Sequence, residues 1–299
     1  MQAAKRSERK DMQQVINGLS IGSVYALIAL GYSLVFGVMR MINLAHCDIM
    51  MIGAYVGYIC TVYLGMGLVL SIIWAVTVCS AVGICIEKFA FRPLKGVTGM
   101  PVMVVAIGVS LLIEYIFMFI FGADTRVYSG SYMRGILSFG DVVIPVSRVV
   151  VLALSVAIMI ALQIVLSKTM AGKAMRAVAD DDFAAELCGV DEKLTTRLAF
   201  ALGSALAAVA GVFYGAMYVI HPLMGTIPGI KAFVAAVVGG IGSVSGAVLG
   251  GFALGMAETF AGAVLHTAFK DVTAYLILIA VLLFRPGGIT GVKSENSRL

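Results

Sequence analysis

Three polar residues, Asn43, His46 and Asp48, interrupt an otherwise apolar stretch that also carries Arg40. Polar side chains at membrane depth are costly, so they are expected to face protein or water. Their spacing allows two readings. Either Asn43 or Asp48 caps a helix at an interfacial turn, or the three residues mark the end of a half-helix that lines a transport pathway.

Other candidates for metal or proton chemistry are few. His46 is not expected to bind a metal, because His221 and His266 share no ligand spacing with it. Glu114 and Glu258 lie in apolar segments, where a proton-coupled carrier would place an acid and where structural pairing is the alternative. The five cysteines include no C-x-x-C pair, so we interpret them as small buried hydrophobic residues.

The sequence shows no nucleotide-binding motif. It contains no G-x-x-x-x-G-K-[ST], no H-E-x-x-H and no kinase-like set. Its G-x-S-x-G match, at 18–22, lies inside a charge-free run and not in the strand-to-helix turn that a hydrolase nucleophile needs. We therefore expect no enzymatic activity and no cofactor or metal bound by this chain. If ATP drives its function, the ATPase must be another chain.

The composition places most of the chain in lipid. Of its 299 residues, 61% are apolar and only 12% are charged, with a mean hydropathy of +1.04. Soluble domains carry about 25% charged residues, so this chain lacks enough charge to cover a water-facing surface. A single membrane domain follows. Nucleic-acid binding is not expected, because the basic clusters flank membrane spans.

Long charge-free runs predict an all-α, polytopic integral membrane protein with about eight hydrophobic segments. The backbone must be hydrogen-bonded internally in lipid, so these runs are expected to be helices. The runs cover residues 12–39, 49–86, 96–113, 149–167, 198–230, 232–257 and 272–284. The second run is long enough for two spans, with a break near Gly65 and Gly67.

Clusters of lysine and arginine set the expected topology. Most of them fall at 5–10, 88–95, 168–197 and 285–298, and the positive-inside rule places such clusters in the cytoplasm. The loop at 123–147 then lies outside.

The expected organisation is a cytoplasmic tail over 1–11, one transmembrane domain over 12–291 and a cytoplasmic tail over 292–299. If every expected span crosses the membrane once, the N-terminus does not fall on the cytoplasmic side that its charge predicts. A half-helix or re-entrant segment in each of two inverted repeats is the preferred resolution. An N-terminus outside, against the charge rule, is the alternative.

A glycine-rich segment at 239–255 is a second candidate for a broken helix. Small residues at four-residue spacing let helix backbones approach closely, and a run of glycines also makes a helix easy to break. Dense packing and a break beside the pathway are both compatible with it. Its candidate residues are Gly239, Gly240, Gly242, Ser243, Gly246 and Gly250.

The polar segment at 168–197 stands out between two apolar runs. Residues 174–179 favour a helix, 180–182 offer caps for a second helical turn, and Gly189 suits a helix C-terminus. A loop that only joined two spans would need a few residues. We therefore interpret this segment as a docking site for a soluble partner.

The same segment and five others resemble a known family. Its Ala-Ala-Glu-x-x-Gly-like core, at 184–189, resembles the coupling loop of ABC-importer permeases. Over about residues 14–291 the chain resembles LivH-type branched-chain amino-acid permeases. The other matching segments are N-G-L-S-I-G-S-V-Y-A-L-I-A-L-G-Y-S-L-V-F-G (17–37), I-N-L-A-H-C-D-I-M-M-I-G-A-Y (42–55), F-R-P-L (91–94), G-G-I-G-S-V-S-G-A-V-L-G-G (239–251) and F-R-P-G-G-I-T-G (284–291). Cys47 departs from the pattern, which has glycine there.

This resemblance implies an importer of branched-chain or other hydrophobic amino acids in a bacterial-type inner membrane. It implies a second related permease, two ATPase subunits that bind ATP and magnesium, and an extracytoplasmic binding protein. The residues implied to couple to the ATPase are Ala174, Arg176, Asp181, Ala184, Ala185, Glu186 and Gly189. Two alternatives stay open: the same architecture carrying urea or short amides, and an ion-coupled secondary transporter.

Overall fold

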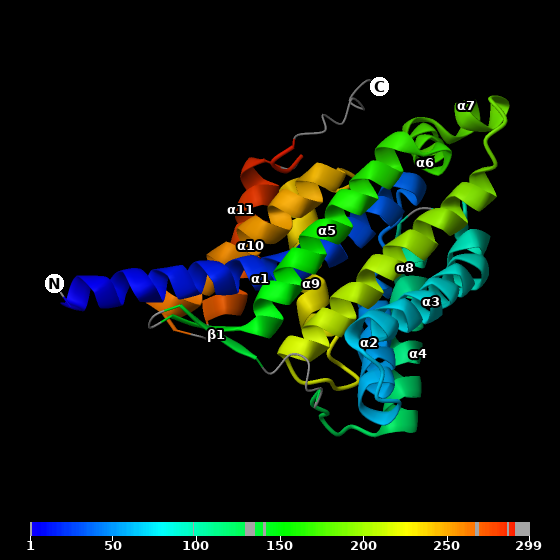
Figure 1. Ribbon diagram of the computed structural model, residues 1–299. Coiled ribbons are helices and arrows are strands. Elements are labelled where there is room, and N and C mark those ends of the chain that lie inside the picture. The colour runs from blue at the N-terminus through cyan, green and yellow to red at the C-terminus, as the bar shows by residue number, and fades with distance from the viewer. Residues whose placement is uncertain are drawn as a thin grey trace.

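Long helices make up most of the chain (Figure 1). The computed structural model describes residues 2–97, 99–128, 135–139, 142–266, 269–285 and 287–290, with the side chains of 2–11, 137–139 and 142–143 left out. Among these residues, six helices are long and apolar enough to cross a membrane. They are α1 (Gln2–Met39), α3 (Leu68–Ile86), α4 (Met100–Phe121), α5 (Val146–Lys168), α8 (Glu192–Met217) and α10 (Val244–Val264). An all-α polytopic fold is therefore confirmed.

Shorter elements complete the described chain. The helices are α2 (His46–Tyr58), α6 (Met170–Asp180), α7 (Asp182–Leu187), α9 (Thr226–Gly239) and α11 (Phe269–Phe284). Single helical turns lie at η1 (Ile59–Tyr63), η2 (Glu87–Phe91) and η3 (Arg92–Leu94). Strands β1 (Ile136–Phe139) and β2 (Val142–Pro145) pair as an antiparallel hairpin. The predicted break near Gly65 and Gly67 is confirmed, because α3 begins directly after it.

Burial separates central helices from peripheral ones. The apolar core of α1 is 89% buried and that of α8 is 72% buried, whereas the core of α4 is only 11% buried. Helices with little protein cover present apolar side chains outward, as lipid requires. The most central helices, α1 and α8, therefore hold the fold together.

Small residues allow α10 to lie against α1 and α9. A Cβ on Gly251 would lie 2.4 Å from the Cα of Ala26, and one on Gly255 would lie 2.3 Å from the Cα of Gly22. On another face of α10, a Cβ on Gly250 would lie 2.0 Å from the carbonyl oxygen of Ala235 in α9. The predicted close helix approach is therefore present on two faces of α10.

Two halves of the bundle are related by an inverted arrangement. Helix α1 packs on α8, α9 and α10, and helix α8 packs on α1, α2 and α3. In this correspondence α1 matches α8, the short α2 matches the short α9, and α3 matches α10. Because α1 and α8 run in opposite directions, the repeat is inverted, as in many transporters (Figure 1).

The short helices α2 and α9 begin inside the bundle. His46, the first residue of α2, lies against Gly31, about two turns before the end of α1. Gly225, at the start of α9, lies against the carbonyl oxygen of Cys47. The expected broken helices are thus found in both halves. The charge-free run at 198–230 is not one helix, because the chain breaks at 218–225. Lys231, which separates that run from 232–257, lies within α9, and the next break falls at 240–243.

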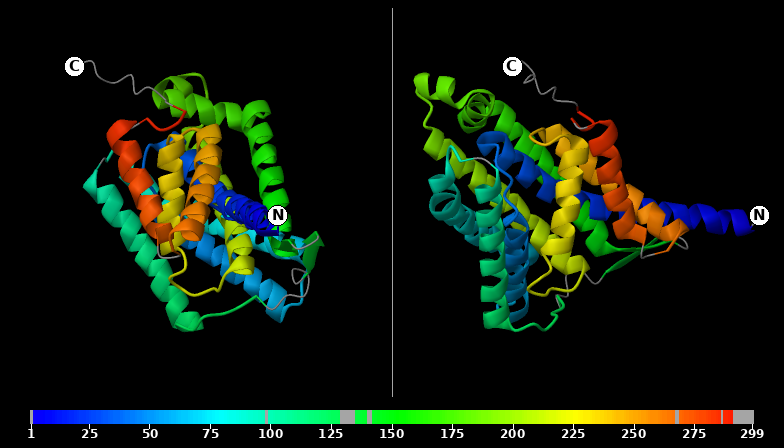
Figure 2. Two further views of the ribbon diagram at one scale, coloured as in Figure 1. Left: turned by 90° about the vertical axis from the view of Figure 1, so that its left-hand side faces the viewer. Right: turned by 180° about the vertical axis from the view of Figure 1, so that it is seen from behind.

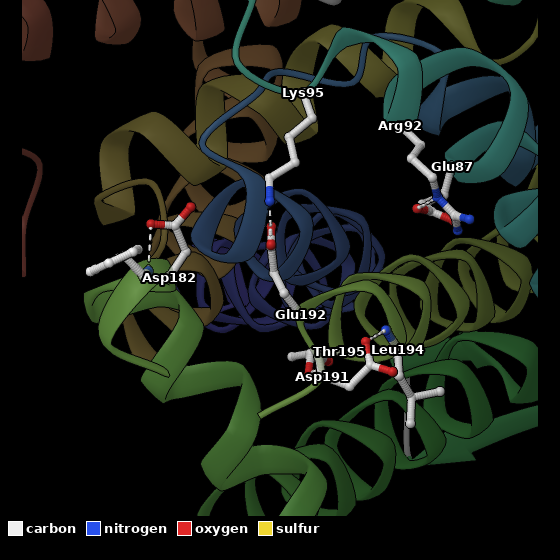
Figure 3. Close-up of polar contacts among 9 residues, drawn as sticks. Glu87, Arg92, Lys95, Asp182, Asp191, Glu192, Leu194 and Thr195 are labelled. Atoms are coloured by element: carbon white, nitrogen blue, oxygen red, sulfur yellow. Dashed lines mark hydrogen bonds and ion pairs between the residues drawn. The ribbon is translucent and has the colours of Figure 1, made fainter. Parts of the chain in front are cut away.

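The bundle has two distinct ends. Helix α5 runs from the β1–β2 hairpin to α6, a length of about 34 Å at 1.5 Å per residue. We call these the hairpin end and the α6–α7 end. Lys95 pairs with Glu192 at the α6–α7 end (Figure 3). The turn from α9 into α10 lies at the same end. The Ile289 amide bonds to the Val238 carbonyl beside that turn.

The start of α1 lies at the hairpin end. Asn17 accepts a hydrogen bond from Arg148 at the start of α5, and α1 extends further outward toward Gln2 (Figure 2). The expectation that 1–11 and 168–197 share one side therefore does not hold. In each half, the half-helix and the extended segment before it together make one crossing. The chain therefore crosses an odd number of times between the start of α1 and the α6–α7 element. Residues 1 and 291–299, including the expected tail at 292–299, lie outside the described residues.

Candidate functional site

The polar segment folds into two capped helices at one end of the bundle. Thr169 caps α6 by accepting a hydrogen bond from the Gly172 amide at 3.2 Å. Asp181 caps α7 through the Ala184 amide at 2.9 Å. Asp191 caps α8 through the Leu194 amide at 3.0 Å (Figure 3). The predicted cap for the second helix is confirmed. Three side-chain caps in 23 residues fix the path of this segment.

Gly189 ends α7 in a left-handed conformation, with φ of +85°. Its amide bonds to the Glu186 carbonyl at 2.9 Å, and the Val190 amide bonds to the Ala185 carbonyl at 3.0 Å. These two bonds form the Schellman motif that glycine favours at a helix C-terminus. The predicted position of Gly189 is therefore confirmed, and the reversal of the chain after α7 follows from it.

The α6–α7 element buries one face and exposes the other. Met175, Val178 and Ala185 face the bundle. Phe183 and Leu187 are 69% and 74% exposed on α7. Large apolar side chains exposed on a polar segment are typical of a surface that a partner covers.

Two arginines attach the element to the membrane helices. Arg40, at the end of α1, donates to the Ala179 carbonyl at 3.1 Å. Arg176 of α6 donates to the Leu166 carbonyl near the end of α5. A displacement of α6 would therefore act directly on α1 and α5.

The seven residues that the resemblance assigned to coupling all lie on this element. Ala185 is buried, and Ala174 is half-buried. The exposed ones are Arg176, Asp181, Ala184, Glu186 and Gly189.

The polar residues of the first half-helix are buried inside the bundle. Asn43, His46 and Asp48 are each at most 2% exposed. The N-cap of α2 is Ala45, without a side-chain hydrogen bond, so the cap expected from Asn43 or Asp48 is wrong. The reading as a half-helix end fits the structure, because α2 begins inside the bundle beside Gly31 of α1.

The glycine-rich segment forms the turn between α9 and α10. Gly240 and Gly242 have φ of +106° and +90°, which a side chain would strain. Ser243 caps α10 through the Gly246 amide at 3.1 Å. A Cβ on Gly246 would lie 2.3 Å from the Gly239 carbonyl oxygen. Both expectations, a break and dense packing, are met in one segment.

An ion-pair cluster in the second half was missed from the sequence. Lys231 of α9 lies 2.5 Å from Glu258 of α10 and 2.7 Å from Asp271 of α11. Lys231 is 5% exposed and Glu258 is 6% exposed. The signal was a single lysine in an apolar run, followed by a single glutamate in the next helix. Glu258 therefore has the structural pairing that was the alternative to a proton role.

Glu114 lies close to the start of α9. It accepts a hydrogen bond from Thr226 Oγ1 at 3.2 Å and is 8% exposed. Among the residues described, no group of three or more histidine, cysteine, aspartate or glutamate side chains is arranged to hold a metal ion.

Central broken helices, an inverted repeat and an exposed helix pair at one end define a multi-pass membrane permease. The chain belongs to the family described as the branched-chain amino acid transport system / permease component, whose model matches residues 14–282. It is a component of a transport system and not an enzyme.

Two relatives match nearly the whole chain. It is 40% identical over 293 residues to the high-affinity branched-chain amino acid transport system permease protein BraD of Pseudomonas aeruginosa, covering 94% of this chain and 95% of the relative. It is 38% identical to the corresponding permease protein LivH of Escherichia coli K12, with the same coverage.

A solved structure shares the fold. PsaBC from Streptococcus pneumoniae, in complex with Fab, matches with a TM-score of 0.52 over 96% of this chain and 97% of the other. The sequence identity is 13%, so the likeness concerns the fold alone.

Proposed function

We propose that this chain is the membrane permease subunit of an ATP-driven importer for branched-chain amino acids, located in a bacterial-type inner membrane. The family and the relatives support the substrate class. The sequence has no nucleotide-binding motif, so ATP and magnesium would bind to two ATPase subunits on other chains. A related second permease and an extracytoplasmic binding protein would complete the assembly.

The single observation that carries the coupling assignment is the α6–α7 element. It is capped at each turn, exposes Phe183 and Leu187, and is attached to α1 through Arg40 and to α5 through Arg176. When a soluble partner moves such an element, the movement is transmitted to the membrane helices that are bonded to it. The mechanism is alternating access, in which the ATPase pair closes on ATP and moves these helices.

This proposal sets the sidedness of the chain. If α6 and α7 meet an ATPase, they face the cytoplasm, and the β1–β2 hairpin faces outside. The start of α1 then lies outside as well, because Asn17 contacts Arg148 at the hairpin end.

Purification of the assembly from its native membrane tests the proposal. A tag on this chain is expected to retain a related permease and an ATPase. The binding protein of the same system, recovered separately, is expected to carry leucine, isoleucine or valine when its ligand is extracted and identified by mass spectrometry. Recovery of the chain without an ATPase would contradict the proposal, and so would urea or an amide as the bound ligand.

A further inference from the structure

A pocket lies where the two half-helices meet. Its volume is about 200 Å³, and its walls come from α1, α2, α4 and α9 together with the segment before α2. It is open on one side, where Ile107 and Ile230 are 46% and 42% exposed. The volume is smaller than the roughly 300–1,000 Å³ of pockets for drug-sized ligands, so it suits a molecule about the size of an amino acid. The residues around it are Tyr32, Leu44, Cys47, Asp48, Ile107, Ser110, Thr226, Ile230 and Phe233.

Two helix N-termini point toward this cavity. Helix α2 begins at His46 and helix α9 at Thr226, and neither has a side-chain cap. A Cβ on Gly225 would lie 2.7 Å from the Cys47 carbonyl oxygen and 3.0 Å from Asp48 Oδ1, so the two starts are in contact. The first turn of a helix carries partial positive charge. At α2 the amides of His46 and Asp48 already bond to the carbonyls of Asn43 and Ala45, so the charge of the two helix starts, and not a set of free amides on α2, favours a carboxylate.

Asp48 supplies the opposite charge. It is 2% exposed, and its Oδ2 has no hydrogen-bond partner in the described part of the chain. Its other side-chain contacts are hydrogen bonds with Ser110 and with the Glu114 carboxyl, and Glu114 also accepts a hydrogen bond from Thr226. None of the residues around the cavity is a lysine or arginine, and Lys231 is paired with Glu258 and Asp271. A buried carboxylate without a cation is costly, so the cavity suits a ligand with a positive group.

An ammonium group fits these surroundings better than a metal ion. The described residues hold no group of three or more metal-binding side chains. The remaining wall is apolar and consists of Leu44, Ile107, Ile230 and Phe233. The cavity thus combines an acid, two helix N-termini and an apolar wall.

We propose that this cavity binds the transported amino acid as a zwitterion. Asp48 holds its ammonium group, the N-termini of α2 and α9 hold its carboxylate, and the wall formed by Ile107, Ile230 and Phe233 holds its aliphatic side chain. The substrate class rests on the proposed function above. The site gives the permease a selectivity of its own, separate from that of a binding protein.

Cys47 provides a direct readout, because its thiol lies beside the cavity. The assembled transporter is placed in nanodiscs, with the other four cysteines of this chain replaced by serine and any reactive thiols of its partners removed. Modification of Cys47 by methyl methanethiosulfonate is followed by mass spectrometry. Saturating leucine is expected to slow it at least tenfold. The same concentration of 4-methylpentanoate, which lacks the ammonium group, is expected to leave the rate unchanged.

The variant Asp48→Asn keeps the shape and removes the charge. It is expected to raise the leucine concentration needed for protection at least tenfold. Asp124→Asn, which removes an exposed carboxylate, is the matched control and is expected to leave protection unchanged. Thermal unfolding of both variants checks that the fold is retained. If Asp48→Asn unfolds, the comparison of leucine with 4-methylpentanoate on the unsubstituted Asp48 chain decides.

Several outcomes would overturn the proposal. They are an unchanged labelling rate with leucine, equal protection by leucine in a folded Asp48→Asn variant, or protection by sodium chloride but not by choline chloride. If Cys47 does not react in any nucleotide state, Ser110→Cys reports on the same cavity. A lack of reaction at both thiols would show a cavity closed to solutes and would also overturn it.

Leucine uptake by the same preparation in vesicles separates this proposal from the proposed function. ATP-driven uptake without protection of Cys47 would keep the importer and discard the site. Protection of Cys47 without ATP-driven uptake would keep the site and discard the importer.

Discussion

Replacing Lys231 with methionine is expected to destabilise the chain by about 3–5 kcal/mol. The substitution leaves Glu258 buried without its cation, 2.5 Å from where the ammonium group was. A buried carboxylate that loses the cation paired with it keeps the full desolvation cost. Thermal unfolding of the protein in detergent is expected to shift to much lower temperature, and the yield of folded protein is expected to fall.

Two matched variants separate this cause from a general loss of packing. The double variant Lys231→Met with Glu258→Gln removes both charges and is expected to recover most of the stability, because Asp271 is half exposed and remains solvated. Lys95→Met breaks the exposed pair with Glu192 and is expected to cost about 0–1 kcal/mol. A Lys231→Met protein as stable as the parent would show that the cluster contributes nothing to the fold.

Truncating Phe183 to alanine is expected to weaken association with the ATPase by about 30-fold, the equivalent of about 2 kcal/mol. Its ring is 69% exposed on α7, where a partner would bury it. Aromatic anchors at the centre of an interface carry much of the binding free energy. Binding of the purified ATPase to nanodisc-embedded permease measures the effect, and leucine uptake is expected to fall with it.

Phe89 supplies the control for this experiment. It is 73% exposed on η2, at the same end of the bundle, but lies outside the α6–α7 element. Phe89→Ala is expected to leave ATPase affinity within about twofold of the parent, since it removes no contact at the docking surface. If Phe89→Ala weakens binding and Phe183→Ala does not, the docking surface lies elsewhere.

Local sequence signals predicted the α6–α7 element well. The cap at Asp181 and the left-handed glycine at Gly189 depend only on neighbouring backbone amides and carbonyls. The break near Gly65 follows in the same way from glycine in a turn. Such features are readable because their partners lie within a few residues.

Boundaries set by distant contacts were not readable. Lys231 marked the end of a charge-free run, yet it lies inside α9 because Glu258 and Asp271 neutralise it. One of the two readings made Asn43 or Asp48 a cap, because such residues favour helix starts, but the N-cap of α2 is Ala45, within the bundle. The meeting of α2 and α9 joins residues far apart in sequence, which no local pattern reveals.

The position of the N-terminus shows the limit of charge counting. Four basic residues at 5–10 favoured a cytoplasmic tail. The structure instead places the start of α1 with the hairpin, through the contact between Asn17 and Arg148. An odd number of crossings separates that point from the α6–α7 element. The two therefore lie at opposite ends of the bundle, although the tail is basic.

Leucine uptake into vesicles that contain the complete assembly tests the central claim most directly. Uptake is expected to require ATP and magnesium on the side that α6 and α7 face, because the chain itself lacks a nucleotide-binding motif. It is expected to continue when an uncoupler collapses the proton gradient. Leucine uptake by the purified chain alone, driven by a pH gradient and without ATP, would contradict the account and identify a secondary transporter.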